Sequence, residues 1–408
     1  MNGSEKEFKH VQAQISASSL TDFETWVKKW ANYMGKANGM GDVHNIFKGV
    51  RALAEKNEKP PSNLTKDSAG NTLGCAKEVA EVWFKFLSKK FSATQAEADR
   101  PAMEALPCTK ANGDNLSVQQ ICKALAKMGN GKACGLDGTP AELYKHSKLC
   151  KGLLICLLQK IWSDEEVPNE FARATFVMLF KNKGSTDDPA KYRCIGLLNH
   201  SYKVLATCLL TRLEKETEKY LSDWQAGFRK HRGCRDNVMI LRTLYDEMLE
   251  QGKDLYVTFI DYSAAFDSVS HKFLDRALKE AGASAKSRAL FRAIYKAASA
   301  STKGQDVDGK EVSSAPFQVN RGVIQGDITS PLYFILALEF ILREHDVVPG
   351  KGVAFGGKHL HTLGYADDAA LIDVDISTAT ARVSSIAAGS KSDADMEISI
   401  SKTEVMQV

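Results

Sequence analysis

The chain has 408 residues, of which 44% are hydrophobic and 25% are charged. This length and composition indicate a globular protein long enough for more than one core. Repeats and low-complexity tracts are absent. The nine cysteines contain no Cys-x2-Cys pair and the nine histidines are scattered, which disfavours a structural zinc finger. There is no secretory signal and no apolar run of membrane-spanning length, so we expect an intracellular, soluble protein with no membrane partner.

The charge is concentrated in one segment. The net charge is only +4, but residues 181–235 hold 12 Lys or Arg against 6 Asp or Glu, a local net charge of +6. A basic segment of this kind suits the binding of a phosphate backbone, although a solvated helix face could produce part of it.

The first 120 residues are predicted to form a mostly helical N-terminal region. Helical patterns run from Phe23 to Tyr33 and from Ala76 to Phe91, and polar linkers lie around residues 59–61 and 109–115.

Residues 121–253 are predicted to be mostly helical, with a basic β-like insertion at 174–200. From residue 254 on, strands and helices alternate, an order that suits an α+β fold. The β-rich run Leu255–Asp261 ends in an acid at the point where the strand leaves the core. A helix follows from His271 to Ala281, with Gly282 placed to end it. Further predicted elements are a helix near 284–299 and a hairpin at Asp308-Gly309.

A glycine-rich segment, residues 321–332, precedes another helix. Ser330 is predicted to be the N-cap and Pro331 the first residue of a helix that runs to about Glu344. Two glycines in this segment allow close backbone approach to a ligand, and Gln325 offers both a donor and an acceptor. The alternative is a plain loop before a core helix.

Two adjacent acids interrupt an apolar stretch at residues 360–372, in the tetrapeptide Tyr365-Ala366-Asp367-Asp368. Apolar and β-branched residues on both sides predict a hairpin with the acids at its turn, and an Asp-Asp turn alone indicates nothing more than a hairpin. If this hairpin lies next to the strand that ends at Asp261, three carboxylates converge at one edge of the sheet. Three hard oxygen donors suit Mg²⁺.

These motifs, in this order, resemble the reverse transcriptase palm and are most similar to the non-LTR (LINE-type) retrotransposon group. The resemblance runs from about Lys127 to Met406. The matching segments are Gly131–Gly138, Lys181–Leu198, Gln225–Arg229 with Arg235-Asp236, Phe259–Asp267, Gln325–Pro331, Tyr365–Asp368 and Ile398–Thr403.

The resemblance implies an α+β fold of the right-hand polymerase type, with an antiparallel palm sheet. It assigns fingers to residues 121–253, a palm to 254–408, and a reverse transcriptase domain to about 174–408. The chain stops at Val408, just after the expected last palm strand, so we expect no thumb domain and weak binding of a duplex.

The resemblance also implies a two-metal catalytic site. Asp261, Asp367 and Asp368 correspond to the acids that hold two Mg²⁺ ions, with Mn²⁺ as an alternative, and the Tyr262 carbonyl is an additional ligand. Lys402 resembles the lysine that protonates the pyrophosphate leaving group, although surface lysines are common.

Further residues resemble those that hold the incoming nucleotide. Phe266 would select deoxynucleotides by clashing with a ribose 2′-hydroxyl, or would simply be a core aromatic residue. Basic side chains would hold the triphosphate, although an exposed basic loop would look the same. Gln325 and the backbone of Gly326 would lie against the nascent base pair. The basic residues are Lys181, Lys183 and Arg193.

The expected function is that of an RNA-directed DNA polymerase, with an RNA template, a DNA primer and deoxynucleoside triphosphates as partners. A catalytically silent nucleic-acid-binding fragment and a group II intron-type enzyme are the alternatives. The location would be nuclear if the element is eukaryotic, and the oligomeric state does not follow from the sequence. Three departures from the family pattern, none at a metal ligand, are Ala264 for Lys, Cys194 for Pro and Ser399 for Asn.

Overall fold

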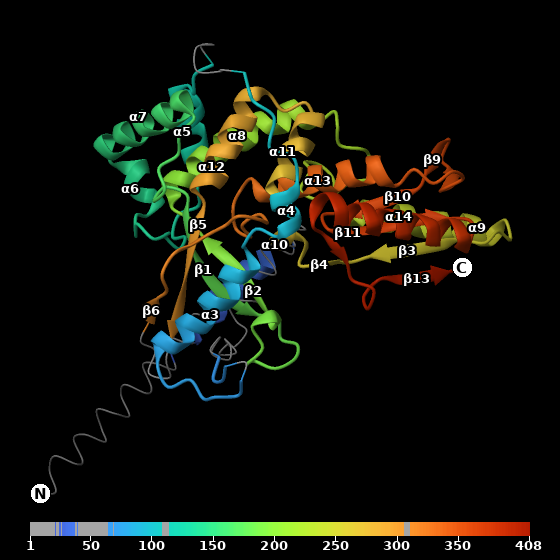
Figure 1. Ribbon diagram of the computed structural model, residues 1–408, viewed down its shortest axis with the longest axis horizontal. Coiled ribbons are helices and arrows are strands. Elements are labelled where there is room, and N and C mark those ends of the chain that lie inside the picture. The colour runs from blue at the N-terminus through green and yellow to red at the C-terminus, as the bar shows by residue number, and fades with distance from the viewer. Residues whose placement is uncertain are drawn as a thin grey trace, which may run out of the picture. The chain divides into compact units, whose positions relative to one another are not determined.

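The computed structural model (Figure 1) describes residues 21, 24–25, 27–36, 39, 64–67, 69–107, 114–305 and 311–408. The chain divides into two compact units, Met1–Ser62 and Asn63–Val408. In the first unit residues 27–36 are helical, in agreement with the helix predicted to reach Tyr33, whereas Phe23 lies outside the described residues. The predicted linkers at 59–61 and, except for its last two residues, 109–115 also lie outside them. Both sheets and the candidate site belong to the second unit.

The first sheet combines strands from two distant parts of the chain. β1 pairs antiparallel with β2 and parallel with β5, and β6 and β7 pair antiparallel with β5. The strands are β1 (Arg173–Phe180), β2 (Tyr192–Leu197), β5 (Ser299–Gln305), β6 (Glu311–Ser313) and β7 (Phe317–Gln318). The strands predicted within 174–200 are therefore confirmed. The sheet also takes strands from beyond residue 253, and the predicted domain boundaries stay predictions. The Asp308-Gly309 hairpin lies outside the described residues.

One helix packs very closely on this sheet. α3 (Ala76–Lys90) packs against β5, where a Cβ on Gly304 would lie 2.2 Å from the carbonyl oxygen of Ala76. Only glycine permits this separation. The buried ring of Trp83 meets the ring of Tyr192 edge-on at 5.0 Å. The other helices here are α4 (Gln95–Asp99), α5 (Val118–Lys127), α6 (Ala141–His146), α7 (Lys148–Asp164), α8 (His200–Thr217) and α12 (Ala285–Ala297), with a 3-10 turn at Pro189–Lys191.

The second sheet is antiparallel throughout, as predicted for the palm sheet. Its strand order is β10-β11-β3-β13. The strands are β10 (Thr362–Tyr365), β11 (Asp368–Asp373), β3 (Tyr256–Ile260) and β13 (Glu404–Gln407). Two short pairs accompany it, β4 (Tyr262–Ser263) with β12 (Glu397–Ile398) and β8 (Val353–Phe355) with β9 (Lys358–Leu360). The helix α9 (Cys234–Glu250) contacts β10.

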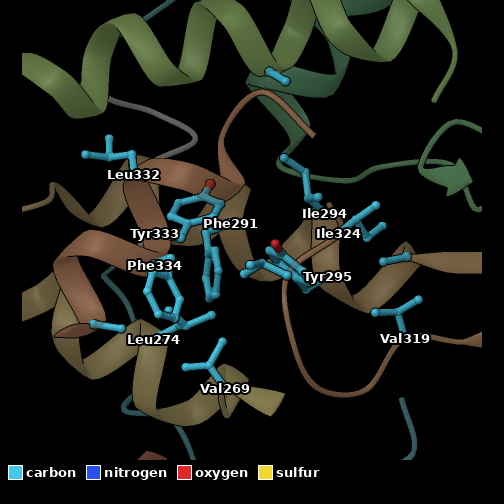
Figure 2. Packing of buried hydrophobic residues seen from close by; sticks show 14 of the residues in the cluster. Val269, Leu274, Phe291, Ile294, Tyr295, Val319, Ile324, Leu332, Tyr333 and Phe334 are labelled. Carbon is cyan, nitrogen blue, oxygen red and sulfur yellow. The ribbon is translucent and has the colours of Figure 1, made fainter. Parts of the chain in front are cut away.

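The core is built around α13 (Ser330–His345), which is buried from Leu332 to Leu342. It packs on α11 (His271–Glu280) and α14 (Ile376–Ala394), and α14 covers β3 and β11. Figure 2 shows rings from α12 and α13 gathered in this core, Phe291 and Tyr295 with Tyr333 and Phe334. No helix in the described ranges is long and apolar enough to cross a membrane.

Two predicted boundaries were wrong by small amounts. The N-cap of α13 is Thr329, so Pro331 is the second helical residue. The hydroxyl of Thr329 binds Asp327 at 2.9 Å, and its backbone is already helical, which moves the helix start by one residue. In the segment Ile398–Thr403, which resembles the strand and lysine that close the palm, only Ile398 lies in a strand, β12, and residues 399–403 form the turn that leads to β13. The helix α11 ends as predicted, before Gly282 at φ +85°.

Candidate active site

Two of the three predicted acids lie opposite each other at the ends of paired strands. β11 runs antiparallel to β3 with Ala369 opposite Ile260, so Asp368 and Asp261 come next in register. Asp367 occupies the turn that joins β10 to β11. The predicted pairing of this hairpin with the strand before Asp261 is confirmed, and it brings the three carboxylates to one end of the sheet.

Asp367 and Asp368 are harder to ionise than ordinary Asp side chains. Burial raises the pKa of Asp367, and the charges of Asp368 and Asp261 raise it further. Burial and the charge of Asp261 also raise the pKa of Asp368. Nearby positive charge would favour the ionised form of both groups.

Lys402 supplies such a charge. Its Nζ lies 2.8 Å from Oδ1 of Asp261, and its charge opposes the rise in the pKa of Asp367 and of Asp368. The backbone places it there: the N–H of Ser399 donates to the Asp261 carbonyl at 2.7 Å, and the Ser399 carbonyl accepts from the N–H of Lys402 at 3.1 Å. The turn that replaces the predicted strand therefore positions the lysine.

The donor chemistry suits a small divalent cation in an open site. Among the residues that the structure describes, no three His, Cys, Asp or Glu side chains are grouped closely enough to hold an ion by themselves. Mg²⁺ is commonly held by one or two carboxylates, while waters and substrate phosphates complete its shell. Asp261 and Asp368, which come next to each other in register, fit that pattern, and Asp367 in the adjoining turn offers a further carboxylate.

Tyr262 can contribute only its backbone to this site. The side chain is buried, its hydroxyl lies 3.0 Å from Oγ of Ser390, and burial raises the pKa of Tyr262 to about 12. The predicted role of its carbonyl as a metal ligand stays a prediction.

The loop that carries Gln325 and Gly326 lies directly on β2. The N–H of Gly196 donates to the Gln325 carbonyl at 2.7 Å. Gly326 has φ +107°, and a Cβ there would lie 2.6 Å from the carbonyl oxygen of Gly196. The glycines of this loop were expected to let the backbone approach a ligand closely. In the structure, Gly326 instead approaches the neighbouring strand β2 closely. This contact fixes the loop on β2, the strand that also carries Arg193.

Asp267 links this loop to a helix far upstream. Its Oδ1 accepts from Nε2 of Gln325 at 3.3 Å, and its Oδ2 accepts from Nζ of Lys90 at 2.6 Å. Neither Asp267 nor Lys90 had a role predicted from the sequence. Asp267 was visible beside Phe266 in the palm motif, whereas no pattern in the sequence points to Lys90, which lies 177 positions earlier.

Phe266 is half-buried, and its ring stacks on Phe334 with the centroids 4.4 Å apart and the planes 17° apart. The residue is therefore part of the core on one face, as the alternative interpretation required. Its remaining exposure leaves the steric role open, because a ring held by stacking is a rigid obstacle.

The predicted phosphate ligands lie on the β1–β2 hairpin. Lys181 donates from Nζ to the Ala190 carbonyl at 2.9 Å. Burial lowers the pKa of Lys181, and the charges of Lys90, Arg193 and Lys402 lower it further. These cations are therefore close enough to interact. Arg193 is exposed on β2, and Lys183 is exposed in the turn of the hairpin.

A hollow of about 340 Å³ adjoins the acids. Its polar lining includes Asp261, Asp368 and Lys402, and its apolar lining includes Val238, Leu241, Phe259, Leu363 and Tyr365. Phe259 and Tyr365 are exposed aromatic residues on this side of the sheet.

Comparison with known proteins identifies the family. The model described as "Reverse transcriptase (RNA-dependent DNA polymerase)" matches residues 180–408, more than half of the chain. A Pol polyprotein from the type-1 retrotransposable element R2 of Popillia japonica is 28% identical over 241 residues, which cover 59% of this chain and 32% of that protein. The RNA-directed DNA polymerase from mobile element jockey of Drosophila funebris is 25% identical over 333 residues, covering 78% of this chain and 34% of that protein.

The chain thus spans about a third of the length of these relatives. Among solved structures, a telomerase from Candida tropicalis in complex with a fragment of telomeric RNA aligns with a TM-score of 0.41 and 12% identity, over 59% of this chain and 42% of that chain. The matched family model and the R2 and jockey relatives lead to one conclusion: the chain belongs to the reverse transcriptase (RNA-dependent DNA polymerase) family, in its LINE-type, non-LTR branch.

Proposed function

We propose that the second unit is the catalytic core of an RNA-directed DNA polymerase. It joins deoxynucleoside triphosphates to the 3′-hydroxyl of a DNA primer paired with an RNA template. The observation that carries the proposal is the meeting of Asp261, Asp367 and Asp368 at one end of the second sheet, with Lys402 beside them. The family to which the chain belongs supports the same activity.

In this proposal the second sheet, with α13 and α14, is the palm of a right-hand polymerase. The β1–β2 hairpin and the helices before it are the fingers. The support is the packing of α14 against β3 and β11, together with the basic hairpin, whose Lys181 is close enough to Lys402 for their charges to interact.

The three acids bind divalent cations, Mg²⁺ or Mn²⁺. Cations held there would make the primer 3′-hydroxyl easier to deprotonate and would balance the charge of the triphosphate. Lys402 is a cationic donor within hydrogen-bond distance of Asp261, so it can deliver a proton to the leaving pyrophosphate.

The chain's other residues bind and orient the nucleotide. Lys181 and Arg193 hold the triphosphate oxygens, because both lie on the basic β1–β2 hairpin and Lys181 is close enough to Lys402 for their charges to interact. Phe266, fixed by its stacking on Phe334, excludes a ribose 2′-hydroxyl. Gln325, held by Asp267, lies against the nascent base pair.

Template and primer bind through backbone charge and duplex shape. The basic segment 181–235 supplies sequence-independent attraction for phosphates. The apolar hollow beside the acids, with the exposed rings of Phe259 and Tyr365, offers a surface for the sugar and base at the primer end.

The test is Mg²⁺-dependent extension of a DNA primer on an RNA template, with deoxynucleotides and ribonucleotides in parallel. We expect extension with deoxynucleotides and its loss in Asp367→Asn, but not in Asp246→Asn, which changes an exposed acid on α9. If the folded protein binds primer–template without extending it, the catalytically silent nucleic-acid-binding alternative replaces the proposal.

A further inference from the structure

The motif Gln225–Arg229, which the proposed function leaves without a role, lies against the turn that carries the acids. The N–H of Ala226 donates to the Gly364 carbonyl at 2.8 Å, and the N–H of Gly364 donates to the Trp224 carbonyl at 2.9 Å. Gln225 and Gly364 also form an isolated parallel β-bridge. Trp224 to Ala226 therefore acts as an extra strand beside β10 and leads directly to the turn.

The side chain of Gln225 binds both backbone polar groups of Ala366. Its Oε1 accepts from the N–H of Ala366 at 3.0 Å and from the N–H of Gly227 at 2.7 Å, and its Nε2 donates to the Ala366 carbonyl at 3.3 Å. The amide is 0% exposed. A buried amide with three backbone partners is a rigid clamp, because each lost bond leaves an unsatisfied polar group inside the protein.

Ala366 is in a conformation that needs such a clamp. Its φ of +60° lies in the left-handed region, which residues with a Cβ rarely adopt. Asp367 and Asp368 follow immediately, so the backbone of Ala366 sets the direction of both carboxylates. Gly227 allows the clamp to come close: a Cβ there would lie 2.2 Å from the backbone nitrogen of Ala366.

Further side chains hold the segment around Gln225 in place. The Arg229 side chain, 5% exposed, donates to the Ser222 carbonyl at 2.6 Å and to the Gln225 carbonyl at 3.1 Å, and pairs with Glu218 at 2.7 Å. From α9, Nδ2 of Asn237 donates to the Gly364 carbonyl at 2.8 Å. These contacts fix both sides of the junction between the extra strand and β10.

We propose that Gln225 is a positioning residue for nucleotidyl transfer, whose amide holds Ala366 in the left-handed conformation and thereby fixes Asp367 and Asp368 opposite Asp261. Its effect on catalysis rests on the proposed function, while its effect on cation binding can be measured without polymerisation. The competing interpretation is that Gln225 only stabilises the fold.

The experiment compares Gln225→Met, which keeps the length of the side chain but removes its polar atoms, with Gln225→Met combined with Ala366→Gly. Glycine adopts a positive φ without steric cost, so it lets the turn keep its shape when the clamp is lost. The matched control is Gln159→Met, which removes a side chain to backbone bond of 2.9 Å between α7 and the Leu116 carbonyl, away from the acids.

Two readouts are taken on the full chain. In primer extension, we expect kcat of Gln225→Met to fall on the order of tenfold to a hundredfold, as for a small misplacement of reacting groups, while the KM for the nucleotide changes little. In thermal unfolding, we expect the increase in Tm on adding Mn²⁺ alone to shrink in Gln225→Met. Both readouts should recover in part when Ala366→Gly is added, and Gln159→Met should change neither.

The outcomes separate this inference from the proposed function. If the unaltered chain shows the Mn²⁺ shift but no extension, the proposed function fails while the clamp is still tested by the loss and recovery of the shift. If the Mn²⁺ shift and kcat of Gln225→Met match those of Gln159→Met, or if Ala366→Gly restores neither, Gln225 does not position the acids and the proposal is wrong. If the unaltered chain shows no Mn²⁺ shift, the acids do not hold the cation and the inference is overturned with them.

Discussion

The ammonium of Lys90 lies 2.6 Å from the carboxylate of Asp267, which also accepts from Gln325 at 3.3 Å. Lys90 is the last residue of α3, and Asp267 belongs to α10 (Ala265–Ser268). The matched family region begins at residue 180. A residue upstream of that region is therefore attached to the side of the site that is proposed to hold the nucleotide.

Breaking this ion pair should destabilise the second unit. Lys90→Met leaves the carboxylate of Asp267, 6% exposed, without its cation. We expect a loss of about 2–4 kcal/mol, less than for a fully buried pair because the Lys90 side chain is 22% exposed. Urea unfolding of Lys90→Met, Asp267→Asn and the double variant measures it. The double variant should lose less than the sum of the single variants, and simple additivity would contradict the pairing.

The ring of Phe266 should control sugar selection. Phe266→Val opens space beside the sugar and should raise kcat/KM for ribonucleotides relative to deoxynucleotides by about tenfold or more, the scale on which a shape change in a pocket alters discrimination. Phe273→Val is the control, because Phe273 packs on Phe340 in the core at 5.3 Å. An unchanged ratio in Phe266→Val would leave the residue as a core aromatic only.

The ionised carboxylate of Asp368 should lower the stability of the protein when no cation is added. The pKa of Asp368 is raised in the folded state, so the folded protein binds this proton more tightly than the unfolded chain does. Binding of this proton stabilises the folded state fully at a pH below the pKa of the unfolded chain, about 3.9 for an ordinary Asp. This stabilisation is lost as the pH rises through the higher pKa of the folded state. In EDTA at neutral pH, Asp368→Asn should therefore have a higher Tm than the unaltered chain.

The pH dependence provides the check on that prediction. The difference in Tm should shrink as the pH falls toward the ordinary Asp value, and Mg²⁺ should raise the Tm of the unaltered chain but not of Asp368→Asn. Asp246→Asn serves as the control, since it changes an exposed acid on α9. A lower Tm of Asp368→Asn at neutral pH would show that the carboxylate stabilises the fold instead.

Arg382 should be essential for the stability of the second sheet. Its guanidinium, 0% exposed, pairs with Asp346 at 2.8 Å and with Asp373 at 2.9 Å, and so ties α14 to the end of β11 and to the residue that follows α13. Arg382→Met leaves two buried carboxylates and should cost about 3–5 kcal/mol in urea unfolding. Lys160→Met, which removes an exposed pair with Asp164, should cost about 0–1 kcal/mol. Equal losses in the two variants would refute the importance of the buried network.

The acids could be predicted from the sequence because their evidence is local. A β-rich run ending at Asp261 and a hairpin with Asp367 and Asp368 at its turn each follow from residue pattern. Alternation along a strand then leaves few registers in which both apolar faces stay buried. Once the two elements pair, the convergence of the carboxylates follows from geometry.

The side chains that hold the site in place could not be predicted in the same way. Lys90 reaches Asp267 across 177 positions, and Gln225 reaches Ala366 across 141. Such contacts depend on tertiary packing, which no local pattern encodes. The start of α13 was misplaced for a different, local reason: Thr329 is the N-cap, but its hydroxyl donates to the buried carboxylate of Asp327 and makes no capping bond.

The parallel pairing of β1 with β5 affects how the protein can fold. β2, β3, β4 and the five helices α8 to α12 are synthesised between these two strands, so β1 gains this neighbour only after Ser299–Gln305 has been made. The entropy of closing so long a loop must be overcome before the pairing stabilises anything, which makes this a slow step of high contact order. Of the second sheet, only β3 lies within the span of chain that forms the first sheet, so the first sheet can be completed once Gln318 has been made, while β3 must wait for β10, β11 and β13.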